Sequence, residues 1–252
     1  YILDNQQILE GSHLSRYGFD QAKDSYTIPF VLRNSSPVDF DCSRFYRLTH
    51  EQKEYETYEK KITGLQEQIR YIRSGKKSQN NYTLDQKSFK IIDGSPFAYW
   101  FGNEILELFK NYPSLSEVAE TAAGISTGNN ARFVRKWWEI DSETRSSDYA
   151  VLQKTGTDNL YYDIPDEYLF WKEDGRAVKE YDGGNGSPNE DYYFTSGITF
   201  RSFGKFFVAR IGHKNMIFSN KAHFVTSNKV DLKVLLGILS SSLSRFIMNG
   251  MN

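Results

Sequence analysis

One segment, residues 124–138, combines the side chains that proteins use to contact nucleic acids. Two glycines bracket a serine and Thr127, and Asn129 and Asn130 follow directly. Glycine lets a backbone approach a ligand closely, and threonine and asparagine form hydrogen bonds without carrying charge. Such groups can contact base edges and phosphate oxygens. We therefore take Thr127, Asn129 and Asn130 as candidate contacts, with ordinary turn residues as the alternative.

The same segment continues with three cations, Arg132, Arg135 and Lys136, and with the pair Trp137–Trp138. No acidic residue occurs in residues 121–138. Because Lys and Arg neutralise phosphates, we expect the three cations to bind a phosphate backbone, the alternative being a solvated face. We expect the tryptophans to be core residues rather than base-stacking ones, because large aromatic side chains are highly buried on average.

Charge is segregated along the chain. The whole sequence has 31 Lys and Arg and 32 Asp and Glu, a net charge of −1. Residues 139–191 nevertheless hold fourteen acidic and five basic residues, whereas residues 192–230 hold no acidic residue at all. Basic surface gathered in this way is typical of nucleic-acid binders. The alternative is a sheet with a basic solvent face and no partner.

Four cations of the acid-free run are candidate DNA contacts: Arg201, Lys205, Arg210 and Lys214. The first two and the last are expected to bind phosphates. Arg210 lies between an alanine and an isoleucine, so it is either a base-reading residue or a buried structural arginine.

The sequence indicates no catalytic centre. It has no P-loop, and the glycines at 183–186 are followed by Ser-Pro rather than by a helix, which makes a poor cofactor loop. One cysteine and four scattered histidines disfavour a zinc site. A nuclease-like spacing is formed by Asp39, Glu51 and Lys53, but acids at the start of a helix are explained by the helix dipole. We expect no catalytic residue, metal or cofactor in this chain.

The elements that must position these residues follow from hydrophobic periodicity. Thr49 and Gln52 form a capping-box pattern at the start of a helix. Apolar residues then recur at alternating spacings of three and four, at Tyr55, Tyr58, Ile62, Leu65, Ile69 and Ile72. This seam spans about two and a half heptads, which is too short for an autonomous coiled coil, so we expect the helix to lie against its own domain or another helix. A polar linker, residues 74–81, follows.

The C-terminal part predicts strands and then a helix. Four strand-like runs, at 197–203, 205–211, 215–218 and 222–226, are separated by turn residues, which favours an antiparallel meander. Leucines from Leu232 to Leu243, with Phe246 and Ile247, predict a closing amphipathic helix. Strands and helices do not alternate regularly, so the predicted class is α+β, with an antiparallel meander, short helices and a long amphipathic helix at each end.

Bulk composition sets the remaining limits. The 252 residues are 39% hydrophobic and 15% aromatic, enough for a real core. No run of eighteen apolar residues occurs, which disfavours a membrane span. The lone Cys42 excludes an intrachain disulfide and fits a reducing cytoplasm. Because the sequence starts with Tyr and stops without a polar tail, we expect a piece of a longer protein.

Several phrases resemble one family. Residues 89–100 are similar to the segment that follows the catalytic domain in BREX-type adenine-specific DNA methyltransferases of phage defence and in related type IIG restriction-modification enzymes. Residues 115–133 resemble the phrase that opens their target recognition domain, including Gly-Ile-Ser-Thr-Gly-Asn-Asn and Arg-Phe. Residues 189–200 and 239–248 resemble the later phrases. The resemblance covers about residues 88 to 252 in the family's order.

The resemblance implies a domain division and a function. Residues 1–47 would be the tail of a methyltransferase domain, 48–87 a connecting helix and linker, and 88–252 a DNA target recognition domain. It implies double-stranded DNA, an upstream methyltransferase domain and defence-system subunits as partners, S-adenosylmethionine as the cofactor of the parent protein, and a cytoplasmic location. This chain departs from the family because it has no Pro-Pro dipeptide, and so lacks the motif that holds the flipped adenine. Residues 138–161 also form a shorter section than is usual in the family.

Two other functions are compatible with the sequence. In one, the heptad seam and the closing helix dock a subunit of a complex, and the basic sheet is incidental. In the other, the triplet at 39, 51 and 53 belongs to a small metal-dependent nuclease domain. A methyltransferase recognition module is the leading hypothesis.

Overall fold

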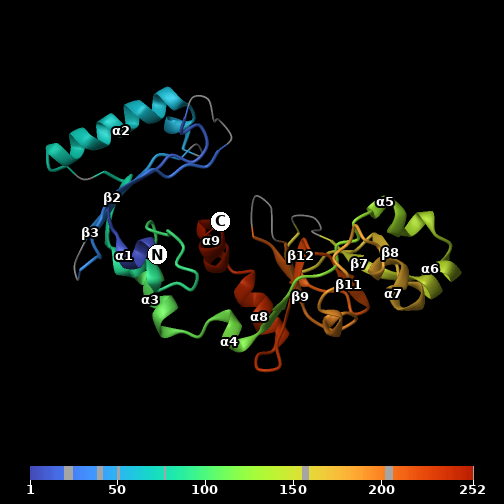
Figure 1. The fold of residues 1–252 in the computed structure, drawn as a ribbon. Helices are drawn as coiled ribbons and strands as arrows, with labels where there is room; N and C mark the ends of the chain where they lie inside the picture. The colour runs from blue at the N-terminus through green and yellow to red at the C-terminus, as the bar shows by residue number, and fades with distance from the viewer. Residues whose placement is uncertain are drawn as a thin grey trace. The chain divides into compact units, whose positions relative to one another are not determined.

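The computed structural model describes residues 1–19, 25–38, 42–49, 52–76, 78–154, 159–201 and 207–251. The chain divides into two units, Tyr1–Tyr112 and Pro113–Asn252, each with its own sheet structure and core (Figure 1). Within the described ranges, no helix has the length and apolar character needed to cross a membrane. Asp39, Glu51 and Lys205 lie outside the described residues.

The first unit contains a four-stranded sheet in the order β2-β1-β3-β4. Its strands are β1 (Gln7–His13), β2 (Phe30–Arg33), β3 (Cys42–Arg47) and β4 (Asn81–Asp85), its helices are α1 (Ile2–Asn5), α2 (Tyr58–Arg73) and α3 (Asn103–Asn111), and its short 3-10 turns are η1 (Lys53–Tyr55) and η2 (Gln86–Lys90). Paired strands run antiparallel except β1 and β3, which run parallel.

Aromatic residues from far along the chain complete the core of this unit. Phe45 of β3 is fully buried, and its ring stacks on that of Tyr99 at a centroid distance of 4.4 Å. Phe89 and Ile8 belong to the same cluster. Residues 89–112 therefore fold with the first unit. The expected boundaries at 47/48 and 87/88 lie within this unit, and the functional division that they mark stays a prediction. The observed division lies between Tyr112 and Pro113.

Helix α2 begins at Tyr58, later than the Thr49 start that the capping-box pattern predicts. Thr57 caps it, its side chain accepting a hydrogen bond from the amide of Lys60. Thr49 and Gln52 do form a side-chain contact, from the Thr49 amide to Gln52 Oε1 at 3.0 Å, but it closes a turn ahead of η1 instead of starting the helix.

The face of α2 that packs on its own unit is offset from the heptad seam. The residues buried on it are Lys61, Gly64 and Gln68, while Ile62 and Ile69 on the seam are 37% and 39% exposed. Gly64 is required here, because a Cβ would lie 2.4 Å from the ring of the buried Tyr55. Tertiary contacts, and not the apolar stripe alone, therefore decide which face of this helix is covered.

Lys61 joins α2 to the ends of two strands. Its side chain is 1% exposed, and its ammonium donates hydrogen bonds to the carbonyl oxygens of Leu14 and Leu48, the second at 2.9 Å. We expect Lys61→Met to lower the free energy of unfolding by about 1–3 kcal/mol. The two buried carbonyl oxygens lose their hydrogen-bond donor, and this loss is only partly offset because a charge no longer has to be buried. Urea denaturation measures this change.

Lys60→Met is the matched control. The Lys60 ammonium lies on the exposed side of α2, 2.6 Å from Glu56, and such surface pairs contribute only about 0.3–0.5 kcal/mol. Equal effects of the two substitutions would contradict the role given to Lys61.

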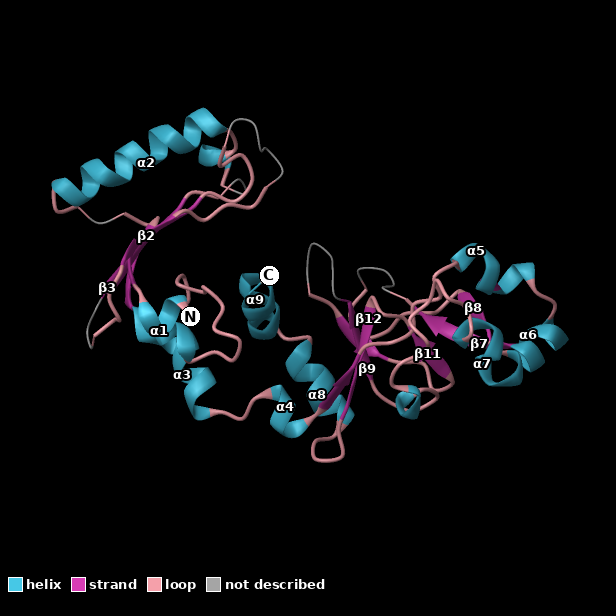
Figure 2. Cartoon of the chain, in the orientation of Figure 1, coloured by secondary structure: helices cyan, strands magenta, loops and turns pink. Residues whose placement is uncertain are grey.

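The second unit has two four-stranded sheets, in the orders β10-β9-β12-β5 and β11-β7-β8-β6. The strands are β5 (Glu120–Ala122), β6 (Val134–Lys136), β7 (Tyr149–Gln153), β8 (Glu167–Phe170), β9 (Ile198–Arg201), β10 (Ala209–Ile211), β11 (Met216–Phe218) and β12 (Ala222–Thr226). The helices are α4 (Leu115–Val118), α5 (Asn130–Phe133), α6 (Ser142–Asp148), α7 (Lys172–Lys179), α8 (Leu232–Leu239) and α9 (Ser242–Met251), with 3-10 turns η3 (Trp137–Glu139) and η4 (Glu190–Tyr192). Figure 2 shows α5, α6 and α7 gathered around β7 and β8.

The α+β class is confirmed, and the sheets are mainly antiparallel. Strands β9, β10 and β12 form the antiparallel part of the expected meander, and β5 joins them through β12. The pairing of β11 differs from that expectation, because β11 leaves this sheet and runs parallel to β7 in the other one. The closing segment is helical, and Ser240–Ser241 divides it into α8 and α9.

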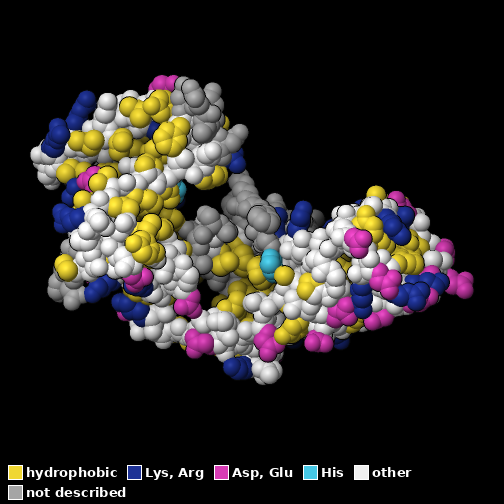
Figure 3. Space-filling model, viewed as in Figure 1, with side chains coloured by type: hydrophobic (Ala, Val, Ile, Leu, Met, Phe, Trp, Pro, Cys, Tyr) yellow, Lys and Arg dark blue, Asp and Glu magenta, His cyan; other side chains and the backbone are white. Residues whose placement is uncertain are grey.

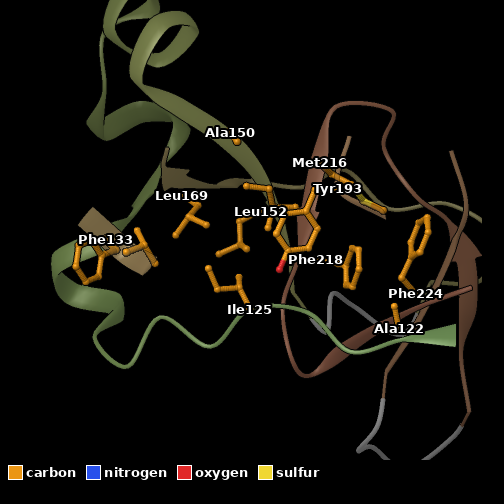
Figure 4. Close-up of a cluster of buried hydrophobic side chains, with 12 residues drawn as sticks. Ala122, Ile125, Phe133, Ala150, Leu152, Leu169, Tyr193, Met216, Phe218 and Phe224 are labelled. Atoms are coloured by element: carbon orange, nitrogen blue, oxygen red, sulfur yellow. The ribbon is translucent and has the colours of Figure 1, made fainter. Parts of the chain in front are cut away.

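One cluster of buried hydrophobic residues joins the two sheets of the second unit. The rings of Phe218 on β11 and Phe224 on β12 stack at 4.8 Å, although the two strands belong to different sheets. Ile125, Leu152 and Leu169 extend the cluster toward α5, as Figure 4 shows. The loop that follows β5 is therefore anchored in this core by Ile125.

Candidate nucleic-acid interface

The glycine-asparagine loop of residues 124–130 runs alongside the end of β11. The amide of Ile125 donates to the carbonyl oxygen of Phe218 at 3.0 Å, and the amide of Asn220 donates to the carbonyl oxygen of Ile125 at 2.9 Å. Gly124 permits this approach, because a Cβ there would lie 1.8 Å from the Phe218 carbonyl oxygen. The first glycine of the segment thus serves close backbone packing.

A second loop, residues 182–189, holds the first one in place. Asn185 accepts a hydrogen bond from the amide of Ser126 at 2.7 Å through Oδ1 and donates from Nδ2 to the carbonyl oxygen of Gly124 at 3.1 Å. Its own amide donates to the Ser126 carbonyl oxygen at 3.1 Å. Three hydrogen bonds from one residue fix the conformation of the 124–130 loop.

The glycines of the two loops meet. Gly128 has a φ of 66°, in the left-handed region that favours glycine, and a Cβ on it would lie 2.1 Å from the backbone of Gly183. The Gly-rich run at 183–186, which the sequence predicts to be a poor cofactor loop, is therefore a support for the candidate site.

A polar pocket of about 370 Å³ opens beside the 124–130 loop. Its lining comes from that loop, the end of β7 and the residues after β11: Ile125, Ser126, Thr127, Gly128, Asn130, Leu152, Lys154, Ser219, Asn220 and Lys221. The lining has hydroxyl, amide and ammonium groups and, among the described residues, no carboxylate. Lys154 is paired with Glu167 at 2.9 Å, whereas Lys221 is exposed.

The three uncharged candidates, Thr127, Asn129 and Asn130, differ in exposure and in hydrogen bonding. Thr127 is 5% exposed, and its hydroxyl donates to Asn130 Oδ1 at 2.7 Å. Asn129 caps α5, its Oδ1 accepting from the amide of Arg132 at 3.1 Å. Asn130 is exposed and lines the pocket. Thr127 and Asn129 thus shape the loop, and Asn130 presents its amide to solvent.

The three cations after this loop also differ. Arg132 is exposed, with its guanidinium 5.0 Å from the ring centre of Phe133. Arg135 donates to the carbonyl oxygens of Ala131 and Val134 at 2.7 and 2.8 Å. The Lys136 ammonium lies 2.7 Å from Asp166, and this hydrogen bond raises the pKa of Lys136. Arg132 is the member of this group best placed for a phosphate.

The cations of the acid-free run divide in the same way. Lys214 is exposed in the turn between β10 and β11, and Arg201 is half-buried on β9. Arg210 is 2% exposed, and its Nη1 lies 2.5 Å from Asp163 Oδ2. Of the two roles that the sequence leaves open for Arg210, its burial and its ion pair with Asp163 favour the structural arginine. Lys205 lies outside the described residues.

The expectation that the tandem tryptophans are core residues is wrong. Trp137 and Trp138 are 51% and 60% exposed. They lie in η3, directly after the edge strand β6, where no further element of the described chain covers them. Sequence alone favours burial for such residues. Their exposure results from the pairing of β6 at the edge of the sheet, which is a property of the tertiary structure.

Contributors to the site that are absent from the candidates that the sequence suggests include Lys154, Asn185 and Lys221. Lys221 belongs to the acid-free run, and that run is the available signal for it. Asn185 lies in a loop whose contact with residues 124–126 spans about sixty positions of sequence. Among the described residues, no group of three or more His, Cys, Asp or Glu side chains is arranged to hold a metal ion.

The chain is related in sequence to adenine-specific methyltransferases. It is 28% identical to the adenine-specific methyltransferase PglX of Lacticaseibacillus casei (strain Zhang) in an alignment of 188 positions that covers 66% of this chain and 16% of that protein. It is 24% identical to the adenine-specific methyltransferase BrxX of Escherichia coli O9:H4 (strain HS), over 98% of this chain and 20% of that protein. The chain thus spans a fifth or less of the length of these relatives. No protein-family profile matches it.

Proposed function

We propose that this chain is the DNA target recognition part of an adenine-specific DNA methyltransferase and presents the target adenine to a catalytic domain outside the chain. The observation that carries the proposal is the pocket beside the 124–130 loop, whose described lining residues include no carboxylate. It brings together the neutral hydrogen-bonding groups of Ser126 and Asn130 and the exposed cation Lys221 from separate elements, beside Lys154, which is paired with Glu167. The sequence relationship to two adenine-specific methyltransferases supports it.

The division of labour has a physical reason. A methyltransferase that acts on a base in duplex DNA must extrude that base, at a cost of a few kcal/mol. A separate module that grips neighbouring base pairs offsets this cost and determines which adenine is extruded. Amide and hydroxyl groups supply hydrogen bonds to base edges, each good bidentate pair discriminating by about 1–3 kcal/mol. Lys and Arg supply affinity through phosphates.

The partners follow from the same proposal. Double-stranded DNA binds the pocket side of the second unit, and the methyltransferase domain that holds S-adenosylmethionine lies in another part of the protein. This chain carries no Pro-Pro dipeptide to hold an extruded adenine. Subunits of a phage-defence system are further partners under this proposal.

The proposal predicts that Lys221→Glu weakens binding to a duplex about tenfold near 100 mM salt, because one phosphate contact is replaced by repulsion. It also predicts that the magnitude of the slope of log K against log salt falls by about one, the contribution of one phosphate contact. Fluorescence anisotropy with a labelled duplex of random sequence, across a salt series, measures both quantities.

Lys233→Glu is the matched control, since Lys233 is an exposed lysine on α8 that does not line the pocket. Equal losses of DNA affinity in the two variants would show a diffuse effect of charge and would argue against a DNA contact at the pocket. Absence of salt-dependent binding by the unmodified protein would contradict the proposal as a whole.

A further inference from the structure

The exposed tryptophan pair is a rigid feature of the second unit. The two rings are nearly perpendicular, at a centroid distance of 5.6 Å. The amide of Trp137 donates to the carbonyl oxygen of Asp166 at 3.0 Å, and Arg145 Nη1 donates to the carbonyl oxygen of Trp137 at 2.8 Å. The backbone that presents these large apolar groups to solvent is therefore held from two sides. Exposed aromatic residues on a fixed backbone are typical anchors of protein interfaces.

An aromatic hollow of about 220 Å³ adjoins this pair through Arg145. Arg145 lines the hollow, and its guanidinium lies 5.6 Å from the ring centre of Tyr168, which also lines it. Trp171 and Phe194 contribute further rings to the lining. The volume is below that of pockets for small organic ligands, about 300–1,000 Å³, and suits one large side chain.

The charge around this surface is acidic. Four exposed carboxylates lie near the tryptophan pair, either close in sequence or through contacts with the neighbouring Lys136: Glu139, Asp141, Glu143 and Asp166. Two cations adjoin the pair. Arg145 donates to the Trp137 carbonyl oxygen at 2.8 Å, and Lys136 is paired with Asp166 and with Glu167 at 2.7 and 3.5 Å. Figure 3 shows acidic side chains gathered with basic ones over the end of the second unit that carries α6 and α7. A polyanion is repelled here, and a cationic partner is attracted.

We propose that Trp137, Trp138 and the adjoining aromatic hollow form a docking surface for a segment of another protein that has one large apolar anchor flanked by Lys or Arg. The apolar anchor fills the hollow, the tryptophans cover it, and the flanking cations meet the exposed carboxylates. This inference is independent of the DNA proposal, because it concerns a surface that shares no lining residue with the polar pocket.

A random dodecapeptide phage library, selected on the full protein, tests the inference without a known partner. The expected result is enrichment of peptides with an aromatic or large aliphatic residue between basic ones. Their affinity, measured by isothermal titration, should fall at least tenfold in Trp137→Ala/Trp138→Ala and several-fold in Glu143→Lys, as expected for aromatic anchors and charge complementarity. Tyr112→Ala, another exposed aromatic, at 67% exposure, should leave the affinity unchanged.

The inference would be overturned by the absence of any enriched peptide, by enriched peptides that are acidic, or by affinities equal in the unmodified protein and both site variants. Glu143→Lys keeps the test decisive if the double tryptophan variant does not fold, because Glu143 is an exposed residue in the first turn of α6. Duplex DNA is titrated in parallel. A tenfold loss of DNA affinity in the tryptophan variant, with peptide binding retained, would assign the surface to DNA instead.

Discussion

Replacing Arg210 with methionine is expected to lower the free energy of unfolding by about 3–5 kcal/mol, because the buried Asp163 carboxylate loses its charged partner. The Arg210 side chain is 2% exposed, that of Asp163 is 11% exposed, and the two groups lie 2.5 Å apart. The contact also joins β10 to the segment before β8, where Tyr161 bridges Arg210. The loss should therefore affect the second unit as a whole.

Urea denaturation followed by circular dichroism measures this effect, and Lys214→Met is the control. Lys214 is an exposed cation four residues away, so its replacement should change stability by less than about 0.5 kcal/mol. Adding Asp163→Asn to Arg210→Met should recover part of the loss, because the buried negative charge is then removed. If Arg210→Met instead abolished DNA binding at unchanged stability, Arg210 would be a base-reading residue and its structural assignment would be wrong.

Gly124→Ala, which adds a single methyl group, is expected to lower the free energy of unfolding by about 2–5 kcal/mol. A Cβ at this position would lie 1.8 Å from the carbonyl oxygen of Phe218, a backbone atom that cannot rotate away. Relief requires the 124–130 loop to separate from β11, which sacrifices the hydrogen bonds between Ile125 and residues 218 and 220. Overpacking costs about 1–3 kcal/mol, and each lost backbone hydrogen bond adds about 0.5–1.5 kcal/mol.

The control for Gly124→Ala is the same substitution in a different environment. Gly237 lies inside α8, and a Cβ added there would meet no neighbouring atom within 4 Å, so Gly237→Ala should stabilise the helix by up to about 1 kcal/mol. Thermal and urea unfolding of both variants give the comparison. Similar effects of the two substitutions would show that the loop does not rest on β11 as described.

The two stability predictions bear on the proposed function. Gly124 and Asn185 hold the 124–130 loop, and that loop supplies half of the polar pocket. A variant that releases the loop should lose DNA binding together with stability, whereas Lys221→Glu should lose binding alone. The pattern across these variants separates damage to the scaffold from removal of a contact.

Local signals in the sequence located many elements correctly. Strand-like runs separated by turn residues marked β9, β10 and β12, and the leucine spacing marked the closing helical segment. The α+β class followed from the irregular order of these elements. These features depend on neighbours within a few residues, so periodicity and turn residues are enough to predict them.

The pairing of β11 and the packing of α2 were not predictable in the same way. Met216–Phe218 has the same strand-like character as its neighbours, and only the parallel partner β7, more than sixty residues earlier, removes it from the meander. In α2, the burial of Lys61 depends on carbonyl groups of Leu14 and Leu48. A heptad stripe identifies an apolar face, but the position of these acceptors selects the face that is covered.

The sequence by itself determined the class of the fold, the acid-free run from 192 to 230 and the glycine-asparagine segment from which the candidate site is built. Tertiary structure alone decided which of those residues remain available to a ligand. Arg210 is buried in an ion pair with Asp163, 47 positions away, whereas Lys221 is exposed. Trp137 and Trp138 are exposed at the edge of a sheet. The physical reason is that residue type and spacing set what a side chain can bind, whereas its burial and its partners depend on segments that only folding brings together.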